Sequence, residues 1–252
     1  MLEQSFIFLP NMGKKSEIKL WMHGIKSWND FVNKKEISGI GSKAKYFYDR
    51  FLIKAKDELD NDNHQFFARY LPSKEAWRAY PHFKDSICYL DIETSGYYGD
   101  ITVIGIYDGF ETKIMVKGFN LFKPLLIDEL RKYKIIVTFN GSSFDMPVIK
   151  RCFGDIFCEH LHIDLRHACS QIGLTGGLKK IEKVLGIERE EEVEGINGGD
   201  AVYLWQMWKA TGNRKYIDLL VKYNEEDVIN LKPLMEYTYN LLKTSKFDGC
   251  MQ

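Results

Sequence analysis

The sequence predicts an α/β fold, in which a mixed sheet flanked by helices follows a small all-α module. Three observations predict it. Short apolar runs typical of buried strands begin near residue 86, and patterns with helical spacing lie between and after them. The first third of the chain instead combines short helical patterns with glycine-containing turns. A chain of 252 residues can bury one sizeable core and a small helical module. We therefore expect a helical domain at residues 1–80 and an α/β domain at residues 81–252.

The expected α/β domain contains strands near residues 87–93, 101–107, 111–117, 134–139 and 158–165. Helices are expected near residues 120–132, 144–153, 178–186, 199–211 and 215–242. The first three strands form a meander, with Asp108-Gly109 as a hairpin turn. Pro233 should bend or interrupt the last helix, because proline lacks the N–H that a helix interior requires.

Two carboxylates, Asp91 and Glu93, end the first expected strand. Because side chains alternate between the two faces of a strand, these acids point the same way. Side by side they repel each other unless a cation lies between them. A lone Asp-x-Glu pair is equally typical of an ordinary strand end with solvated acids, so this pair alone proves little.

A third acid, Asp145, follows the strand-like run 134–139 and the turn residues 140–143. Asparagine, glycine and serine in that turn are typical of a helix N-cap, so Asp145 falls in the first turn of the next helix. The helix dipole alone would explain an acid at this position.

The last expected helix carries Tyr223 and Asp227, which are four residues apart and therefore share one helix face. Glu225 and Glu226 should point elsewhere, into solvent. A Tyr-x3-Asp pair on a helix is commonplace by itself.

The order of the three blocks is more specific than any one of them. Asp-x-Glu on a strand, Asn-x3-Phe-Asp at a strand-to-helix turn and Tyr-x3-Asp on a late helix resemble the motifs of the DnaQ-like 3′–5′ exonucleases, in the tyrosine variant called DEDDy. The segment 86–242 is also similar to the RNase H-like nucleases called YprB-like. That similarity includes HIDL at 162–165, LKKIEKVLGI at 178–187 and GDAVYLWQMW at 199–208. The resemblance implies an RNase H-like mixed sheet.

The resemblance also implies the chemistry of the site. The ligands of two Mg²⁺ or Mn²⁺ ions would be Asp91, Glu93, Asp145 and Asp227, with Asp91 bridging the ions. Hard oxygen ligands suit these ions. Two ions about 3.5–4 Å apart can orient a water and neutralise charge on a phosphate. Tyr223 would hold or polarise that water.

Substrate contacts are implied for a few more residues. Asn140 and Phe144 match motif positions that shape the site or contact nucleic acid. Lys179 and Lys180 follow a glycine turn that lacks phosphate-loop spacing, and either lysine is a candidate phosphate contact. The implied substrate is DNA or RNA with single-stranded or frayed ends.

The N-terminal third contains two segments, 9–25 and 37–46, that resemble helix-hairpin-helix elements. Gly13 corresponds to Gly41, whereas Asn11 stands where the second copy has Gly39. Such hairpins direct backbone N–H groups at phosphates, and nearby lysines add attraction. The nucleic-acid-binding residues expected here are Gly13, Lys14, Lys15, Gly39, Gly41 and Lys43. The alternative is a small helical domain whose glycines are turn residues only.

Other sites are less favoured. The five cysteines include no Cys-x2-Cys pair, which argues against a disulfide framework. Cysteines and histidines are concentrated between residues 152 and 169. We interpret this segment as a strand leading into a helix, and a zinc site there is the minor alternative. Whether Asp164 or His162 joins the metal site stays open.

Charge and hydropathy limit the partners. The net charge of zero argues against tight nonspecific binding to long duplexes, because that affinity comes from phosphate neutralisation. Residues 1–85 are nonetheless basic, and the remainder is acidic. No apolar run approaches membrane-spanning length and no signal-peptide pattern is present, so we expect no membrane partner and a cytoplasmic location.

Three function classes therefore remain. The first is a metal-dependent 3′–5′ exonuclease, which hydrolyses ester bonds of DNA or RNA. The second is a structure-specific endonuclease that uses the same metals, which the hairpin-like segments favour. The third is a nucleic-acid-binding module with a vestigial catalytic core, against which the complete set of acids argues.

Overall fold

The computed structural model describes residues 1–96 and 99–248. Its centre is a five-stranded sheet with the strand order β3-β2-β1-β4-β5. The strands are β1 (Ile87–Thr94), β2 (Ile101–Tyr107), β3 (Thr112–Val116), β4 (Ile135–Thr138) and β5 (Leu161–Asp164). The pairs β1–β2 and β2–β3 are antiparallel, whereas β1–β4 and β4–β5 are parallel. This mixed sheet, flanked by helices, confirms the predicted fold class.

The connections between strands follow the sequence closely, with one correction. The turn after β2 begins at Asp108, whose carboxylate accepts the N–H groups of Phe110 and Glu111, each at 2.8 Å. Gly109 has the positive φ of 100° that this turn requires. The prediction that the last strand begins at residue 158 is wrong. A turn with a hydrogen bond from His160 N to Phe157 O precedes it, so β5 starts only at residue 161.

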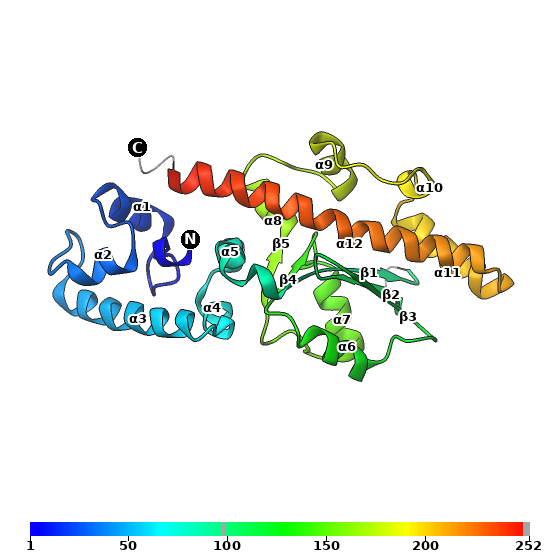
Figure 1. Cartoon of the computed structure of the whole chain (residues 1–252), viewed down its shortest axis with the longest axis horizontal. Helices are drawn as coiled ribbons and strands as arrows, with labels where there is room; N and C mark the ends of the chain where they lie inside the picture. Colours follow the sequence, from blue (N-terminus) through cyan, green and yellow to red (C-terminus); the bar gives the residue numbers. More distant parts are fainter. Residues whose placement is uncertain (97–98, 249–252) are drawn as a thin grey trace.

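Helices cover both faces of the sheet (Figure 1). The long helix α12 (Arg214–Lys243) packs along one face, and α6 (Lys123–Leu130) and α7 (Asp145–Phe153) cover the other. This arrangement explains why β1 is an almost continuous apolar run, because a strand with both faces covered needs apolar side chains on both. Cys88, Leu90 and Ile92 of β1 pack in the cluster with α6 and α7. The alternate residues of β1 therefore face α12.

The segment between β5 and α12 forms shorter helices. They are α8 (Leu165–Ser170), α9 (Leu178–Leu185), α10 (Glu191–Glu194) and α11 (Gly198–Thr211). Asn197 and Asp200 form a capping box that fixes the start of α11. In Figure 1, α9 and α10 lie beyond α12, on the side away from α6 and α7. The four-residue α10 was not predicted.

Of the two effects predicted for Pro233, interruption of the last helix is wrong, because α12 continues past it to Lys243. A bend at Pro233 stays a prediction. Pro233 lies on an exposed part of the helix, as does Ile229 four residues earlier. Proline removes the hydrogen bond to the Ile229 carbonyl, and water can replace that bond on an exposed face. A short π-helical turn, η4 (Thr244–Asp248), follows the helix.

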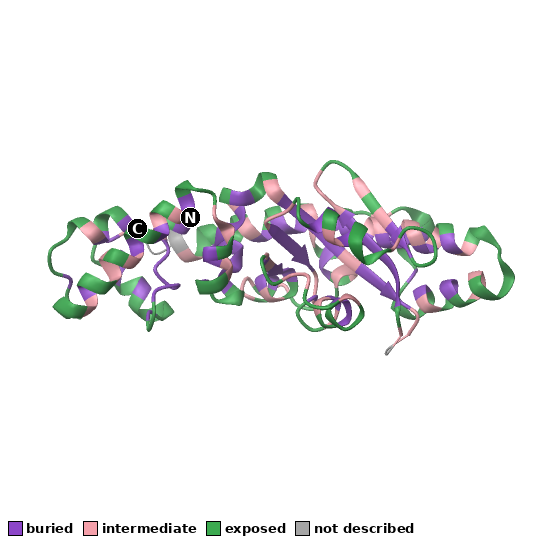
Figure 2. Cartoon of the chain, turned by 90° about the horizontal axis from the view of Figure 1, so that it is seen from below, coloured by how far each residue is buried: buried purple, intermediate pink, exposed green. Residues whose placement is uncertain are grey.

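Residues 1–86 fold into helices and turns that precede β1. Their bounds are η1 (Leu2–Gln4), α1 (Lys14–Met22), α2 (Trp28–Asn33), α3 (Ser42–Asp60), α4 (His64–Tyr70), η2 (Ser73–Ala79), α5 (Tyr80–Phe83) and η3 (Lys84–Ser86). One buried apolar cluster, which includes Phe6, Trp28 and Phe67, extends without a break to Ile87 and Leu161 of the sheet. Figure 2 shows this buried material running from the N-terminal helices toward the strands. A domain boundary at residue 80 stays a prediction.

A buried ion network joins α1 to η2 within this segment. The carboxylate of Glu17 accepts hydrogen bonds from Phe6 N at 2.6 Å and from the Arg78 guanidinium at 2.8 Å. Arg78 also pairs with Glu75 at 2.8 Å, and all three charged side chains are about 1% exposed. A buried ion pair needs partners for every charge, and this network supplies them. Across residues 1–96 and 99–248, no helix combines the length and the apolarity that crossing a membrane requires.

Candidate metal centre

Three of the predicted acids meet between the sheet and α12. Asp91 and Glu93 lie on the face of β1 that α12 covers, and Asp227 lies on α12 itself. One carboxylate oxygen from each of these residues lies within 4.8 Å of the other two. Three hard oxygen donors at this separation could hold a divalent cation such as Mg²⁺ or Mn²⁺. Glu93 and Asp227 are 8% and 6% exposed, so the cluster is largely withdrawn from water.

The electrostatics of this cluster favour binding of a cation. Burial, followed by the negative charges of Asp227 and Asp145, raises the pKa of Asp91 and of Glu93 well above the ordinary range. Burial also raises the pKa of Asp227, although the Arg189 guanidinium opposes that change. Carboxylates that repel one another in a buried space gain most from a bound positive ion. The donor set therefore fits a hard divalent metal.

Asp145 is next to this group but is not part of it. It opens α7 on the opposite face of the sheet, is 2% exposed and accepts the backbone N–H of Ile92 at 3.2 Å. Burial raises the pKa of Asp145 to about 7, and the charge of Asp227 contributes to that increase. Its carboxylate thus lies at the backbone edge of β1 and interacts electrostatically with the cluster.

Asp91 has a partner that sequence reasoning missed. Asn224 is completely buried on α12, and its Nδ2 donates a hydrogen bond to Asp91 Oδ2 at 2.8 Å. The sequence contains one signal for this role: Asn224 directly follows Tyr223 in the third motif block.

Asp227 also has a partner that the sequence did not indicate. The Nη2 of Arg189, in the loop between α9 and α10, donates to Asp227 Oδ1 at 2.5 Å. The same guanidinium pairs with Glu182 through Nε at 2.8 Å and through Nη2 at 2.7 Å. Asn230 adds a hydrogen bond to Glu182 at 3.1 Å. The charges therefore alternate along Glu182, Arg189 and Asp227, which places Asp227 in a fixed orientation.

Tyr223 lies beside the acids, as its helical spacing from Asp227 predicts. It is 6% exposed, and its hydroxyl is hydrogen-bonded to Asp227. Burial and the neighbouring carboxylates raise the pKa of Tyr223, so the phenol stays protonated. The Nζ of Lys179 lies 4.9 Å from the Tyr223 ring centroid, and the Arg189 guanidinium carbon lies 6.0 Å from it. Within the described residues, the buried Lys179 Nζ has no hydrogen-bond partner.

Glu225 and Glu226 correct the expectation that both point into solvent. Glu225 accepts a hydrogen bond from Thr112 on β3, and Glu226 accepts the backbone N–H of Glu190 at 3.0 Å. Both are half-buried. They connect α12 to its neighbours and lie outside the acidic group.

The loop before α7 holds Asn140 and Phe144. Asn140 has a left-handed φ of 66°, and its side chain accepts a hydrogen bond from Arg166 at 2.7 Å. Phe144 is the half-buried N-cap residue of α7. A Cβ at Gly141 would lie 2.1 Å from Thr138 Oγ1, so this tight loop requires glycine there.

Asp164 and His162, left open by the sequence, have structural partners instead of a place in the acidic group. Asp164 accepts backbone N–H groups of Asn140 at 2.9 Å, Ser142 at 3.0 Å and Arg166 at 3.0 Å. It therefore fixes the loop and caps α8. His162 is hydrogen-bonded to Thr138 at 2.9 Å, and burial lowers the pKa of its imidazole to about 4.

The minor zinc alternative gains no support from the described residues. Cys152 and Cys158 are exposed, and Cys169 is buried against Thr238 at 3.3 Å. Within the part of the chain that the structure describes, these residues form no group with metal-ligand spacing.

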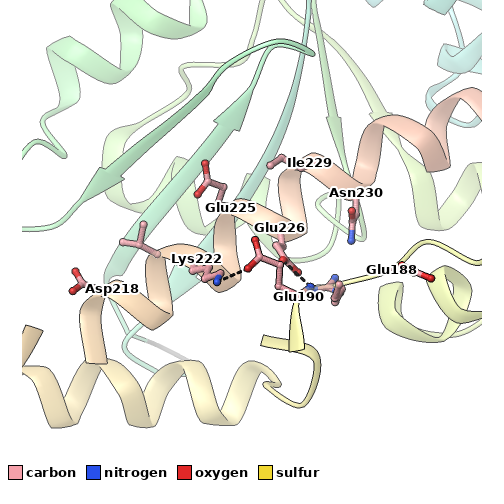
Figure 3. A pocket seen from close by; sticks show the side chains of 10 residues that line it. Glu188, Glu190, Asp218, Lys222, Glu225, Glu226, Ile229 and Asn230 are labelled. Carbon is pink, nitrogen blue, oxygen red and sulfur yellow. Dashed lines mark hydrogen bonds and ion pairs between the residues drawn. The ribbon is translucent and has the colours of Figure 1, made fainter. Parts of the chain in front are cut away.

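A surface hollow of about 870 Å³ lies on the outer side of α12, next to the loop that carries Glu188 and Glu190. Figure 3 shows Lys222 and Glu226 of α12 facing that loop, with Lys222 paired to Glu190. None of Asp91, Glu93 and Asp227 lines this hollow. Arg189 does, and because it also contacts Asp227, it lies between the hollow and the acids.

The two N-terminal hairpin segments have matching backbone geometry. Asn11 and Gly39 have positive φ angles of 62° and 82°, which explains how asparagine replaces glycine in the first segment. The hydrogen bonds Met12 N to Leu9 O and Ile40 N to Ile37 O are both 3.0 Å long.

Gly13 and Gly41 are the N-cap residues of α1 and α3. Lys14, Lys15 and Lys43 are all exposed, and Lys14 also pairs with Glu75 at 2.8 Å. These helices lie at the end of the molecule opposite α11 in Figure 1.

A comparison with known protein families agrees with this architecture. The family model described as the RNase H superfamily matches residues 88–239, which begin within β1 and end within α12. No curated protein sequence matches the chain. The matched segment contains the sheet except for Ile87, the first residue of β1, and covers more than half of the 252 residues. The chain therefore belongs to the RNase H superfamily.

Proposed function

We propose that the protein is a metal-dependent nuclease of the YprB-like, DEDDy type, which hydrolyses DNA or RNA as a 3′–5′ exonuclease. One observation carries the proposal: oxygens of Asp91, Glu93 and Asp227 lie within 4.8 Å of one another, although the residues come from opposite ends of the matched segment. Such convergence of buried acids is costly without a cation to compensate it. The RNase H-like fold supports nucleic acid as the substrate.

The proposed metal ligands are Asp91, Glu93 and Asp227, with Asp145 as the fourth. When bound, two divalent ions of the Mg²⁺ or Mn²⁺ type would supply an activated water and neutralise charge on the phosphate. Asp145 differs from the others because the Ile92 N–H holds it at 3.2 Å. We propose that it shares in the site from the α7 side.

Tyr223 is proposed to orient the attacking water. Because its pKa is raised, the Tyr223 hydroxyl keeps its proton at neutral pH. It would therefore act as a hydrogen-bond donor and acceptor for the water and not as a base. Hydrogen bonding to Asp227 fixes the hydroxyl beside the carboxylates. Mutation to phenylalanine keeps the ring that Lys179 contacts, and would therefore isolate the hydroxyl's contribution.

Lys179 is proposed to contact the substrate phosphate. Within the described residues, its Nζ beside Tyr223 has no hydrogen-bond partner, and its positive charge attracts the Glu93 carboxylate. Burial, followed by the charge of Arg189, lowers the pKa of Lys179. An anionic phosphate oxygen would offset both effects. Asn140 and Phe144 are proposed to contact the nucleotide on the α7 side.

The segment 1–80 is proposed to be a nucleic-acid-binding domain. The matching hairpins at 9–13 and 37–41 support this role, since each precedes a helix N-terminus. Exposed Lys15 and Lys43 would add attraction for phosphates. Lys14 is also exposed, but part of its charge is already compensated by Glu75.

Hydrolysis of oligonucleotides labelled at one end tests the proposal. DNA, RNA and hybrid substrates are incubated with Mg²⁺ or Mn²⁺, using wild type, Asp91→Asn and Asp227→Asn. We expect stepwise shortening from the 3′ end with wild type and a loss of at least about 1,000-fold in each variant, because charge stabilisation at the phosphate is the largest catalytic effect here. Variants as active as wild type contradict the proposal.

A structure-specific endonuclease is the second candidate, and the paired N-terminal hairpins are the observation that favours it. Both candidates share the acids and differ in the substrate end they need. Circular single-stranded substrate separates them, because an exonuclease has no end at which to begin. Cleavage of the circle supports the endonuclease.

A further inference from the structure

We infer that Asn224 is a positioning residue for Asp91, and that Gly105 is the glycine that lets it reach this carboxylate. The inference rests on the proposed metal centre and deepens it. Asn224 is 0% exposed, and its Nδ2 lies 2.8 Å from Asp91 Oδ2. This contact joins the helix that carries Asp227 to the strand that carries Asp91.

The contact gives Asp91 a partner of the kind that its neighbours also have. Asp145 accepts the Ile92 N–H, and Asp227 accepts the Arg189 guanidinium. A hydrogen bond to a carboxylate fixes the plane of that group and engages one of its oxygens. Partners of this kind orient metal ligands and change metal affinity when they are removed. For Asp91, Asn224 has this role.

Asn224 can approach β1 only because Gly105 has no side chain. In the antiparallel β1–β2 register, Gly105 lies directly opposite Asp91. A Cβ built at Gly105 would lie 2.3 Å from Asn224 Oδ1 and 3.1 Å from Val228 Cγ1. The first separation is too short for any atom pair that is not bonded, so an alanine there must displace the amide.

The position of Gly105 supports a specific requirement for glycine. It lies within the otherwise bulky strand β2, where glycine weakens strand formation and offers no side chain to pack. A glycine in a strand interior often marks a close approach by another group. Here that group is the Asn224 amide. Glycine weakens β2, but it leaves the space in which the amide can hydrogen-bond to Asp91 and orient it.

A purely structural role for Asn224 makes a different prediction. Within the described residues, Asn224 Oδ1 has no hydrogen-bond partner, so the amide's bond to Asp91 is the polar contact that offsets its burial. If the residue only packed α12 against the sheet, its loss would lower stability and leave the metal affinity of the folded protein unchanged. A positioning residue changes that affinity.

Mn²⁺ titration of the full chain, followed by electron paramagnetic resonance, separates the two roles without nucleic acid. Asn224→Ala should raise the Mn²⁺ dissociation constant about 10- to 100-fold. Asn240→Ala is the matched control, because Asn240 is exposed on the same helix, and it should bind Mn²⁺ like wild type. Circular dichroism establishes that each variant is folded before titration.

A double-mutant cycle tests the part played by Gly105. Gly105→Ala alone should weaken Mn²⁺ binding, because the new methyl group displaces the amide. In the Asn224→Ala background it should have little further effect, since the amide that the methyl group displaces is gone and Val228 Cγ1, at 3.1 Å, has to shift only by a few tenths of an ångström. Should Gly105→Ala fail to fold, restored folding in the double variant supports the same coupling.

Wild-type Mn²⁺ affinity in folded Asn224→Ala overturns the inference. So does a double variant whose dissociation constant rises by the product of the fold-changes seen in Asn224→Ala and Gly105→Ala. Both results leave the proposed nuclease standing if wild type cleaves nucleic acid. Wild type that binds Mn²⁺ and cleaves nothing overturns only the nuclease proposal, because the titrations still measure the effect of Asn224. A wild type that binds no Mn²⁺ overturns both.

Discussion

Arg189 Nη2 lies 2.5 Å from Asp227 Oδ1, so a cation from a loop contacts a carboxylate of the candidate metal centre. The Arg189 side chain is 4% exposed and Glu182, its other partner, is 2% exposed. The three charges form a buried chain that connects the loop after α9 to α12. This chain holds Asp227 in one orientation.

Removing Arg189 should destabilise the protein strongly. In Arg189→Ala, Glu182 and Asp227 would remain buried without their cation, which we expect to lower the free energy of unfolding by about 3–5 kcal/mol. Urea denaturation of the metal-free protein measures this change. Arg214→Ala is the control, because Arg214 is exposed, and it should change stability by less than about 0.5 kcal/mol. Equal effects of the two substitutions would contradict the importance of the buried chain.

Lys179 and Lys180 differ in ways that make a matched pair. Lys179 has a buried Nζ beside Tyr223, whereas Lys180 is exposed. Lys179→Ala should lower kcat/KM for oligonucleotide hydrolysis on the order of 100-fold, because a positioned donor stabilises charge on the phosphate. Lys180→Ala should lower it only slightly. A larger loss in Lys180→Ala would show that the wrong lysine has been assigned to the phosphate.

The stability of the metal-free protein should fall as pH rises toward neutrality. Burial raises the pKa of Asp145 to about 7, above the value of about 3.9 for an unfolded aspartic acid. The folded state therefore binds this proton more tightly, and the stability it contributes is full below about pH 4 and lost as pH rises through about 7. Thermal melting in chelator from pH 5 to pH 8 should show a steeper decline for wild type than for Asp145→Asn. Parallel declines would contradict the raised pKa.

The N-terminal lysines should control how salt affects nucleic-acid binding. The double variant Lys15→Ala, Lys43→Ala should bind single-stranded oligonucleotide more weakly than wild type at low salt. The slope of log affinity against log salt should fall by up to about 1 for each lost phosphate contact. Lys84→Ala, at another exposed position, should keep the wild-type slope. Fluorescence anisotropy at several salt concentrations measures both slopes, and an unchanged slope in the double variant argues against the hairpins as binding elements.

Local chemistry explains what the sequence could predict. The alternation along β1 places Asp91 and Glu93 on one face, and the spacing on α12 places Tyr223 beside Asp227, without knowledge of the rest of the fold. The five predicted strands are present, because short apolar runs bounded by turn residues are local signals. The shorter β5 reflects a turn that an apolar run alone does not reveal.

The remaining features depend on tertiary approach. Asn224 reaches Asp91 only because α12 crosses β2 at Gly105. Nothing in the sequence indicates that Asn224 and Gly105 are in contact. Arg189 reaches Asp227 from the loop between α9 and α10, 38 residues away in the sequence. Asp145 lies beside the acidic group because the Ile92 N–H of β1 holds its carboxylate, a contact that the sequence does not reveal.

Anomalous scattering from crystals soaked in Mn²⁺ tests the central claim most directly. The account predicts a strong Mn²⁺ peak among the carboxylate oxygens of Asp91, Glu93 and Asp227, and its loss in Asp227→Asn. Crystals with no peak there at saturating Mn²⁺, or with the peak unchanged in the variant, would contradict the assignment of these acids as a metal centre.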